Sequence, residues 1–254
     1  MTSTEDNSRR TAVAEDERVR SVAPQGSARL RMFYRLLPSI SVYFRRRRMM
    51  KLISILDLKP GTRVLDLGGA PAIWEHVPVP LEITLLNLPG AVTAGEKEML
   101  ESPGLKHHTF LVKEGDACNA VEFADHSFDL VFSNSVIEHV GPPGKQAEFA
   151  REVARLGKAY WVQTPSKWFP IEAHSGMPYY WLYPEAMRRA LMNNWRKRLP
   201  GWWADYISTT RVLSRQRMSE LFPNGQTRVE YYLGFPKAYV SHSRDRGDHG
   251  LRTS

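Results

Sequence analysis

The sequence lacks the features that mark several classes of protein. It has one cysteine, Cys118, so no intrachain disulfide can form. No apolar run approaches the roughly 18–20 residues that a membrane-spanning helix needs, and the first residues hold no apolar segment of the kind that marks a secretory signal. Because a lone thiol suits a reducing compartment, we expect a cytoplasmic protein with no transmembrane segment.

Two kinds of catalytic centre are also missing. The histidines and the cysteine show no metal-ligand spacing such as Cys-x-x-Cys or His-Glu-x-x-His. No nucleophile elbow around a serine accompanies a histidine and an acid. We therefore expect neither a metal site nor a hydrolytic triad.

The composition is that of an ordinary globular domain with a basic surplus. With 254 residues, of which 42% are apolar and 24% charged, the chain can form one sizeable α/β domain with a full core. The net charge is +8, from 35 basic and 27 acidic residues. Such a surplus suits nucleic acid, anionic lipid or an acidic substrate, and it equally suits a solvated basic surface.

The chain divides into three parts. Residues 1–27 are polar with scattered apolar residues, which predicts a disordered leader. Residues 28–60 predict a helical segment, with a helix over Val42–Leu58 whose four successive arginines, 45–48, spread around the axis. Pro60-Gly61 ends this segment, and residues 61–254 form the main domain.

Apolar strands alternate with helical stretches in the main domain, which predicts a parallel sheet with helices on both faces. The predicted strands are Arg63–Leu67, Ile83–Asn87, His108–Val112, Phe128–Ser133 and Lys158–Gln163, and the clearest helix is Lys145–Leu156. Two late strands, Gln226–Leu233 and Lys237–Ser241, predict a closing antiparallel pair.

Residues 164–210 interrupt this rhythm with an aromatic-rich insertion, which we interpret as a lid. Met187, Leu191 and Trp195 fall at helical spacing and predict a partly buried helix face. The neighbouring basic and aromatic residues are compatible with stacking on nucleic acid, with a peripheral membrane contact, or with a packed lid that has a charged exterior.

The most informative motif is Val64-Leu65-Asp66-Leu67-Gly68-Gly69-Ala70, an apolar strand that runs into small residues. A ligand can approach the backbone there, at the carboxyl end of a strand, because glycine carries no Cβ. A tight turn without a ligand would read much the same.

Three later strand ends carry polar residues. Asn87 follows the second strand at the place where a side chain can bond a ribose hydroxyl, although an asparagine opening a turn reads alike. Asp116 follows the third and could accept a hydrogen bond from an adenine amine, or lie exposed in a loop. After the fourth comes Phe128-Asp129-Leu130-Val131-Phe132-Ser133-Asn134-Ser135-Val136-Ile137-Glu138-His139.

In this order and spacing, the four blocks resemble motifs I to IV of the class I S-adenosylmethionine-dependent methyltransferases, and most closely the methyltransferase type 11 group. The resemblance covers about Leu58 to Gln163 and extends to about Ser241 through the late strands. It implies a Rossmann-like, seven-stranded, mostly parallel sheet with an antiparallel last strand, helices on both faces and S-adenosylmethionine as cofactor. Residues 61–254 would then be the methyltransferase domain, with the lid insertion at 164–210.

The resemblance also implies a set of cofactor-binding positions. They are Asp66, Gly68, Gly69, Ala70, Asn87, Leu88, Asp116, Ala117, Asn134 and Ser135. Two departures stand out: Ala70 and Ala72, with Pro71 between them, replace glycines that the family usually has, and Asn87 replaces an acid.

Transfer to an oxygen or nitrogen acceptor requires loss of a proton, which suits a histidine. His139 follows the fourth strand, and His174 lies at the entry to the lid, two residues after Glu172, which could orient it if the loop is irregular. Both are candidate bases, and a structural role in helix capping or packing explains the presence of either histidine as readily.

We therefore expect a methyltransferase acting on an oxygen, nitrogen or carboxylate of a small molecule or glycan. Two alternatives stay open. One is a methyltransferase acting on RNA or protein, and the other is a Rossmann-like binding module without catalysis, since the glycine loop is altered.

Overall fold

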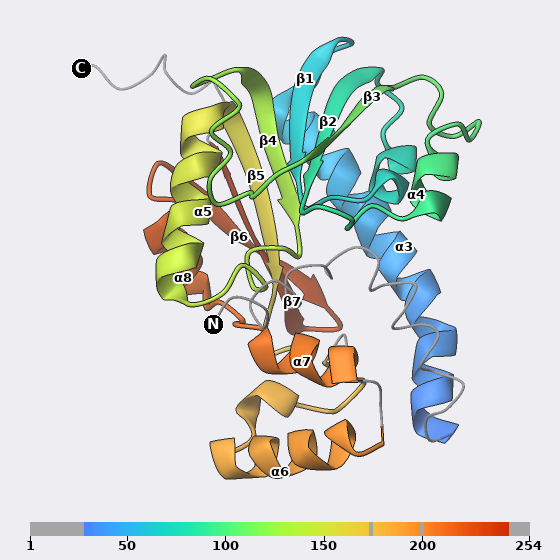
Figure 1. The fold of residues 1–254 in the computed structure, drawn as a ribbon, viewed down its shortest axis with the longest axis vertical. Coiled ribbons are helices and arrows are strands. Elements are labelled where there is room, and N and C mark those ends of the chain that lie inside the picture. Colours follow the sequence, from blue (N-terminus) through green and yellow to red (C-terminus); the bar gives the residue numbers. More distant parts are fainter. Residues whose placement is uncertain (1–27, 173–174, 199–200, 244–254) are drawn as a thin grey trace.

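The computed structural model describes residues 28–172, 175–198 and 201–243. The predicted leader, residues 1–27, lies outside them. A sheet of seven strands runs through the centre, with helices against both faces and a helical insertion beyond one edge (Figure 1). Among the described residues, no helix combines the length and apolar character that a membrane span requires.

Seven strands form the sheet in the order β3-β2-β1-β4-β5-β7-β6. Their bounds are β1 Thr62–Leu67, β2 Leu81–Asn87, β3 Thr109–Glu114, β4 Phe128–Asn134, β5 Gly157–Pro165, β6 Gly225–Tyr232 and β7 Phe235–Ser243. The first five strands pair in parallel, and β7 is antiparallel to both β5 and β6. The predicted sheet, with its antiparallel last strand, is confirmed, and strand ends differ from the prediction by one or two residues.

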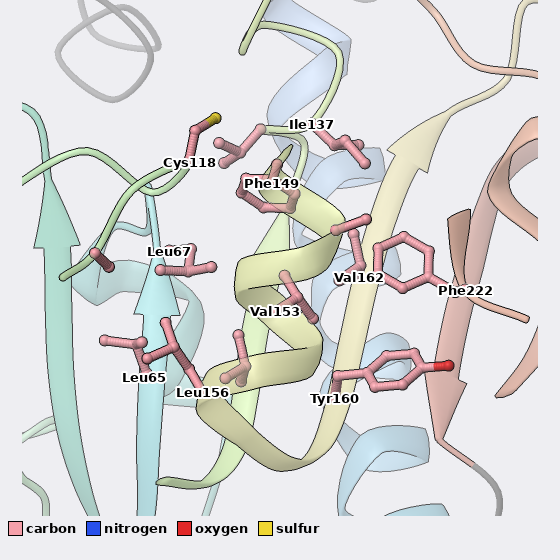
Figure 2. Packing of buried hydrophobic residues seen from close by; sticks show 14 of the residues in the cluster. Leu65, Leu67, Cys118, Ile137, Phe149, Val153, Leu156, Tyr160, Val162 and Phe222 are labelled. Carbon is pink, nitrogen blue, oxygen red and sulfur yellow. The ribbon is translucent and has the colours of Figure 1, made fainter. Parts of the chain in front are cut away.

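One face of the sheet is covered by α5 (Pro143–Leu156) and α8 (Arg215–Leu221). Phe149, Val153 and Leu156 of α5 point onto the sheet, where they meet Leu65 and Val162 (Figure 2). The helical spacing of these apolar residues gave the same inward face in the sequence. This cluster fixes where α5 begins, at the carboxyl end of β4.

The other face is covered by the long helix α3 (Ala28–Leu56), the 3-10 helix η2 (Pro71–His76) and the short helix α4 (Ala94–Met99). Met49, Leu52 and Trp74 are fully buried there. The sequence predicted a helix starting at Val42, whereas the structure has one helix running through Pro38. A proline removes a single backbone hydrogen bond, and here the helix continues past it.

The segment between β5 and α8 forms a unit of its own, which we call the insertion. It contains η3 (Tyr180–Leu182), α6 (Glu185–Arg196) and α7 (Gly201–Thr209), and it lies beyond the carboxyl ends of the parallel strands (Figure 1). Its core is a separate apolar cluster around Tyr180, Met192, Ala204 and Ile207.

The predicted buried face of α6 is only partly right. Leu191 and Trp195 pack against the cluster of the insertion, but the Met187 side chain is 48% exposed. Met187 lies in the first turn of a helix that begins at Glu185, beyond the reach of the small cluster.

Candidate functional site

Asp66 lies at the carboxyl end of β1 and is fully buried. Its Oδ2 accepts a hydrogen bond from Trp74 Nε1 at 2.8 Å, while Oδ1 has no hydrogen-bond partner among the described residues. Burial raises the pKa of this carboxyl from 3.8 to about 7, against the lowering effect of the Trp74 bond. A buried carboxylate oxygen without a donor is a place for a ligand donor to bind.

The two glycines after β1 are required by the protein's own side chains. A Cβ at Gly69 would lie 1.8 Å from Oδ2 of Asp66. Gly68 has φ +70°, and a Cβ there would meet Val136 at 2.8 Å. Ligand approach was the reason expected for these glycines from the sequence, and the structure adds that they make room for the Asp66 carboxylate and for Val136 after β4.

The helix after this loop is short. Pro71 opens η2, a 3-10 helix of six residues, at the place where Ala70 and Ala72 replace the glycines that the family usually has. The φ and ψ of Ala70 are extended. Because proline is accepted in a first helical turn, the Ala-Pro-Ala sequence fits this tighter turn.

Asn87 and Asp116 also lie at the carboxyl edge, and each already has an internal bond. The Asn87 amide donates to the carbonyl of Gly69 at 3.0 Å and so ties the end of β2 to the glycine loop. Asp116 Oδ1 accepts from the backbone N–H of Cys118 at 2.8 Å. Their neighbours Leu88 and Ala117 are partly buried at the same edge.

Asn134 ends β4 and contacts a buried ion pair. Its Oδ1 accepts from Arg48 of α3, and the same guanidinium donates through Nε to Oε1 of Glu230 at 3.0 Å and through Nη2 to Oε2 at 2.5 Å. Burial alone would raise the pKa of Glu230, but the charge and hydrogen bonds of Arg48 outweigh it and hold that pKa below its usual value.

Ser135 continues the chain in the left-handed region, with φ 58°. Its hydroxyl donates to Oε1 of Gln163 at 2.9 Å, and its N–H donates to the Gln163 carbonyl at 3.0 Å. Asn134 and Ser135 are therefore held in place from α3 on one side and from β5 on the other.

Lys237 was not predicted from the sequence. Its ammonium lies 4.4 Å from the centre of the Phe44 ring and 5.8 Å from that of Phe169. Burial, followed by the charge of Arg48, lowers the pKa of Lys237 to about 8. Lys237 is the third residue of β7, and nothing in its local sequence marks a cationic side chain that lies between rings from α3 and the insertion.

His139 lies beneath the insertion in a set of hydroxyl contacts. Its Nε2 is 2.9 Å from the Tyr206 hydroxyl, its Nδ1 is 3.3 Å from the Thr210 hydroxyl, and its ring stacks on that of Tyr206. The Thr210 hydroxyl donates to the Tyr206 carbonyl, so it can only accept from Nδ1. This arrangement suits the tautomer with its proton on Nδ1, in which Nε2 accepts from Tyr206; Nε2 also lies 3.9 Å from Oε1 of the buried Glu138.

Glu138, the residue before His139, is fully buried and accepts from the Thr164 hydroxyl at 2.9 Å. The second candidate base, His174, lies outside the described residues. Its neighbour Glu172, which the sequence suggested could orient it, accepts from both the N–H and the hydroxyl of Ser175, at 2.6 and 2.7 Å.

The carboxyl edge thus brings together most of the predicted positions: the Asp66 turn, Asn87, Asp116, and the Asn134–Ser135 pair. The strand order 3-2-1-4-5-7-6, together with an acid at the end of the first strand, identifies the fold. This is the class I methyltransferase fold. Residues 74–159 match the family model of the methyltransferase domain, a match that begins after the glycine loop.

Solved structures with this fold are similar to the chain at low identity. One is a phosphoethanolamine N-methyltransferase 2 from Haemonchus contortus in complex with S-adenosylmethionine (TM-score 0.52, 13% identity, 78% of this chain and 52% of that one). Another is a possible exported protein from Bordetella parapertussis (TM-score 0.55, 16% identity, 92% of this chain and 80% of that one). A third is the mitomycin 7-O-methyltransferase MmcR (TM-score 0.50, 18% identity, 91% of this chain and 59% of that one).

The chain spans 52% of the length of the first methyltransferase and 59% of the third. A comparison with curated proteins gives no match. The fold is therefore shown, and the acceptor has to be argued from the site.

Proposed function

We propose that this protein is an S-adenosylmethionine-dependent methyltransferase whose acceptor is a small molecule or glycan. The observation that carries the proposal is the unpartnered, fully buried Oδ1 of Asp66 at the carboxyl end of β1. Open α/β sheets bind ligands at this edge. The amino-acid end of S-adenosylmethionine carries an ammonium, which supplies the donor that this oxygen lacks.

The other predicted positions fit the remaining parts of the cofactor. The Asn87 amide nitrogen and Asp116 Oδ1 form the internal bonds described above, which leaves Asn87 Oδ1 and Asp116 Oδ2 to suit ribose hydroxyls and an adenine amine. Asn134 and Ser135 would lie beside the methionine part of the cofactor. S-adenosylmethionine, when bound, supplies a methyl group on a sulfonium that is already a good leaving group.

The protein's own contribution is then alignment and removal of a proton. His139 accepts a hydrogen bond from Tyr206 on Nε2, so the Tyr206 hydroxyl can take the acceptor's proton as its own passes to the imidazole. The His139 side chain is only 9% exposed beneath the insertion, which holds Tyr206, so the insertion limits the access of water to this pair. The stack of the two rings keeps the pair aligned.

Calorimetric titration with S-adenosylmethionine and S-adenosylhomocysteine tests the cofactor. We expect binding by the wild type and at least about tenfold weaker binding by Asp66→Ala and Asn134→Ala, since each removes a hydrogen-bond acceptor. Asp57→Ala is the matched control, because this exposed aspartate lies between α3 and β1, outside the glycine loop, and forms an ion pair with Lys59. Absence of heat with millimolar cofactor in the wild type would reject the proposal.

For the proton step, we expect His139→Ala to lower turnover by roughly 10²–10⁴-fold while cofactor affinity stays the same. Tyr206→Phe keeps the ring stack and removes the hydroxyl, so it should lose nearly as much. Acceptors are screened with radiolabelled cofactor. Normal turnover in His139→Ala would remove its role as base, and loss in His139→Ala alone would show that it acts without Tyr206.

One observation favours a second candidate, a binding module without catalysis. The glycine loop is replaced by Ala-Pro-Ala, and the family match begins only at residue 74. Under this reading, the protein binds S-adenosylhomocysteine and S-adenosylmethionine equally and consumes neither. Slow conversion of S-adenosylmethionine in the presence of any acceptor would decide against it.

A further inference from the structure

A cavity with a volume of about 460 Å³ lies between the body of the protein and the insertion. The body contributes Gln146 of α5 and Arg217 of α8, and the insertion contributes Trp181, Arg188 and its last segment, Thr210–Ser214. This volume lies in the range of small-molecule sites. The cavity is separate from Asp66, which does not line it.

The charge of this cavity is one-sided. Lys167, Arg188, Arg211 and Arg217 line it, and no aspartate or glutamate is among the described residues of its wall. Four cationic groups around one space repel each other unless an anion lies between them. The amino end of α5 adds to this field, because Pro143 lines the cavity and the first turn of α5 holds no acid.

The contacts of the arginines leave most of this charge without a counter-ion. Arg211 donates through Nη1 to the carbonyls of Ser208 and Thr210, at 2.7 and 3.1 Å. Arg217 donates through Nη2 to the carbonyl of Pro143 at 3.2 Å, and its one contact with an acid among the described residues is a long one, to Glu220 at 3.5 Å. Nε of Arg188 is buried and has no hydrogen-bond partner among the described residues. A buried guanidinium N–H without an acceptor points to an absent ligand oxygen.

The cavity adjoins the His139 group. Thr210 lines the cavity and contacts Nδ1 of His139 at 3.3 Å, and the N–H of Arg211 donates to the carbonyl of Glu138 at 2.7 Å. Thr210 therefore separates the cavity from His139, so an anionic group in the cavity would bind one residue away from the His139–Tyr206 pair.

We infer that this cavity binds the phosphate group of a phosphorylated small molecule. A phosphate carries about −1.5 to −2 charges near neutral pH and three acceptor oxygens, which matches several arginines better than a single carboxylate does. The role of this molecule as methyl acceptor rests on the proposed function, whereas binding of the phosphate does not depend on it.

The test is titration of the full chain with inorganic phosphate and with glycerol 2-phosphate, at ionic strength held constant with chloride. Trp181, which lines the cavity, supplies a fluorescence signal, and calorimetry confirms the constants. We expect saturable binding of both phosphates and no binding of glycerol. In Arg188→Gln, the dissociation constant should rise at least about tenfold, because a charge-assisted hydrogen bond is lost.

Arg189→Gln is the matched control. Arg189 neighbours Arg188 on α6, has a 71% exposed side chain and pairs with Glu185 at 3.5 Å, so phosphate affinity should change less than about twofold. Thermal unfolding checks that both variants fold, and Arg188→Lys, which keeps the charge, should lose less than Arg188→Gln.

The outcomes separate the two proposals. No phosphate binding by the wild type, or equal loss in Arg188→Gln and Arg189→Gln, overturns the phosphate site. Phosphate binding without S-adenosylhomocysteine binding leaves the phosphate site in place and rejects the methyltransferase. The reverse result keeps the methyltransferase and removes the phosphate site.

Discussion

At the scale of single residues, Asp66 has the most unusual environment among the described residues with a resolved pKa shift. It is an acid in the middle of a sheet, fully buried, with one of its two oxygens bonded to Trp74. Burial disfavours the charged form, and the one indole bond does not compensate for it. A buried carboxylate with an unpartnered oxygen lowers the stability of the protein unless a ligand donates a hydrogen bond to that oxygen. Such strongly shifted acids are typical of functional sites.

This environment makes stability depend on pH. Because burial raises the pKa of Asp66 to about 7 from 3.8 in the unfolded chain, its stabilising effect is complete below pH 3.8 and is lost as pH rises through 7. Asp66→Asn does not titrate, so the wild type should lose up to roughly 4 kcal/mol relative to this variant between pH 4 and 8. Urea unfolding across this range measures it, and a constant difference would contradict the shift.

Gly69 depends on Asp66 in turn. In Gly69→Ala, the new Cβ would lie 1.8 Å from the carboxylate, so we expect a loss of about 2–4 kcal/mol in the free energy of unfolding. Gly95→Ala is the control, because nothing lies within 4 Å of a Cβ there and the residue is helical. It should change stability by less than about 1 kcal/mol in the favourable direction. Equal effects at both positions would count against the packing argument.

At the scale of elements, α3 is fixed to the far edge of the sheet through one buried charge. Arg48 is 4% exposed and joins α3 to Glu230 of β6 and Asn134 of β4. Through Met49 and Leu52, the same helix also packs on the face of the sheet that lies opposite α5 and α8. This helix therefore contributes both to the core and to the position of a candidate site residue.

We expect Arg48→Met to destabilise the protein by about 3–5 kcal/mol, because Glu230 would remain buried without its partner. The double variant Arg48→Met/Glu230→Gln should recover most of this loss. Arg47→Met is the control, since the Arg47 side chain is exposed and donates one long hydrogen bond to the Tyr43 hydroxyl, at 3.4 Å. Chemical denaturation gives the double-mutant cycle. Additive losses would show that the two residues are not coupled.

At the scale of the whole molecule, two large apolar clusters hold the helices to the sheet, and a third, smaller cluster holds the insertion together. The insertion meets the body through polar contacts, such as those of His139 with Tyr206 and Thr210. Its position over the carboxyl edge (Figure 1) makes it the part most able to open for a ligand.

We therefore expect the backbone amides of α6 and α7 to exchange hydrogen together, and faster than those of β4 and β5. Met192→Ala should speed exchange throughout both helices and leave the sheet unchanged, because Met192 is 6% exposed in the insertion's own cluster. Met187→Ala, on the same helix but 48% exposed, should have no effect. Exchange of the insertion in step with β5 would show that it is not a separate unit.

Much of the fold was readable from the sequence because its signals are local. The alternation of apolar strands and the helical spacing of Phe149, Val153 and Leu156 require only neighbours in the chain. Even Arg48 carried a signal: it lies four residues after Phe44 and four before Leu52, both buried, so helical spacing places it on the inward face. The Val42 start was wrong because Pro38 does not interrupt α3.

The sequence by itself determined the sheet, its antiparallel closing strand and the gathering of polar strand ends at one edge, because periodicity and strand direction follow from the chain alone. Only the tertiary structure decided which charges meet. Arg48 and Glu230 are 182 residues apart in the chain, and Arg188 and Arg217 line one cavity from separate elements. Long-range electrostatic contacts have no local period, so they become visible only when the chain is folded.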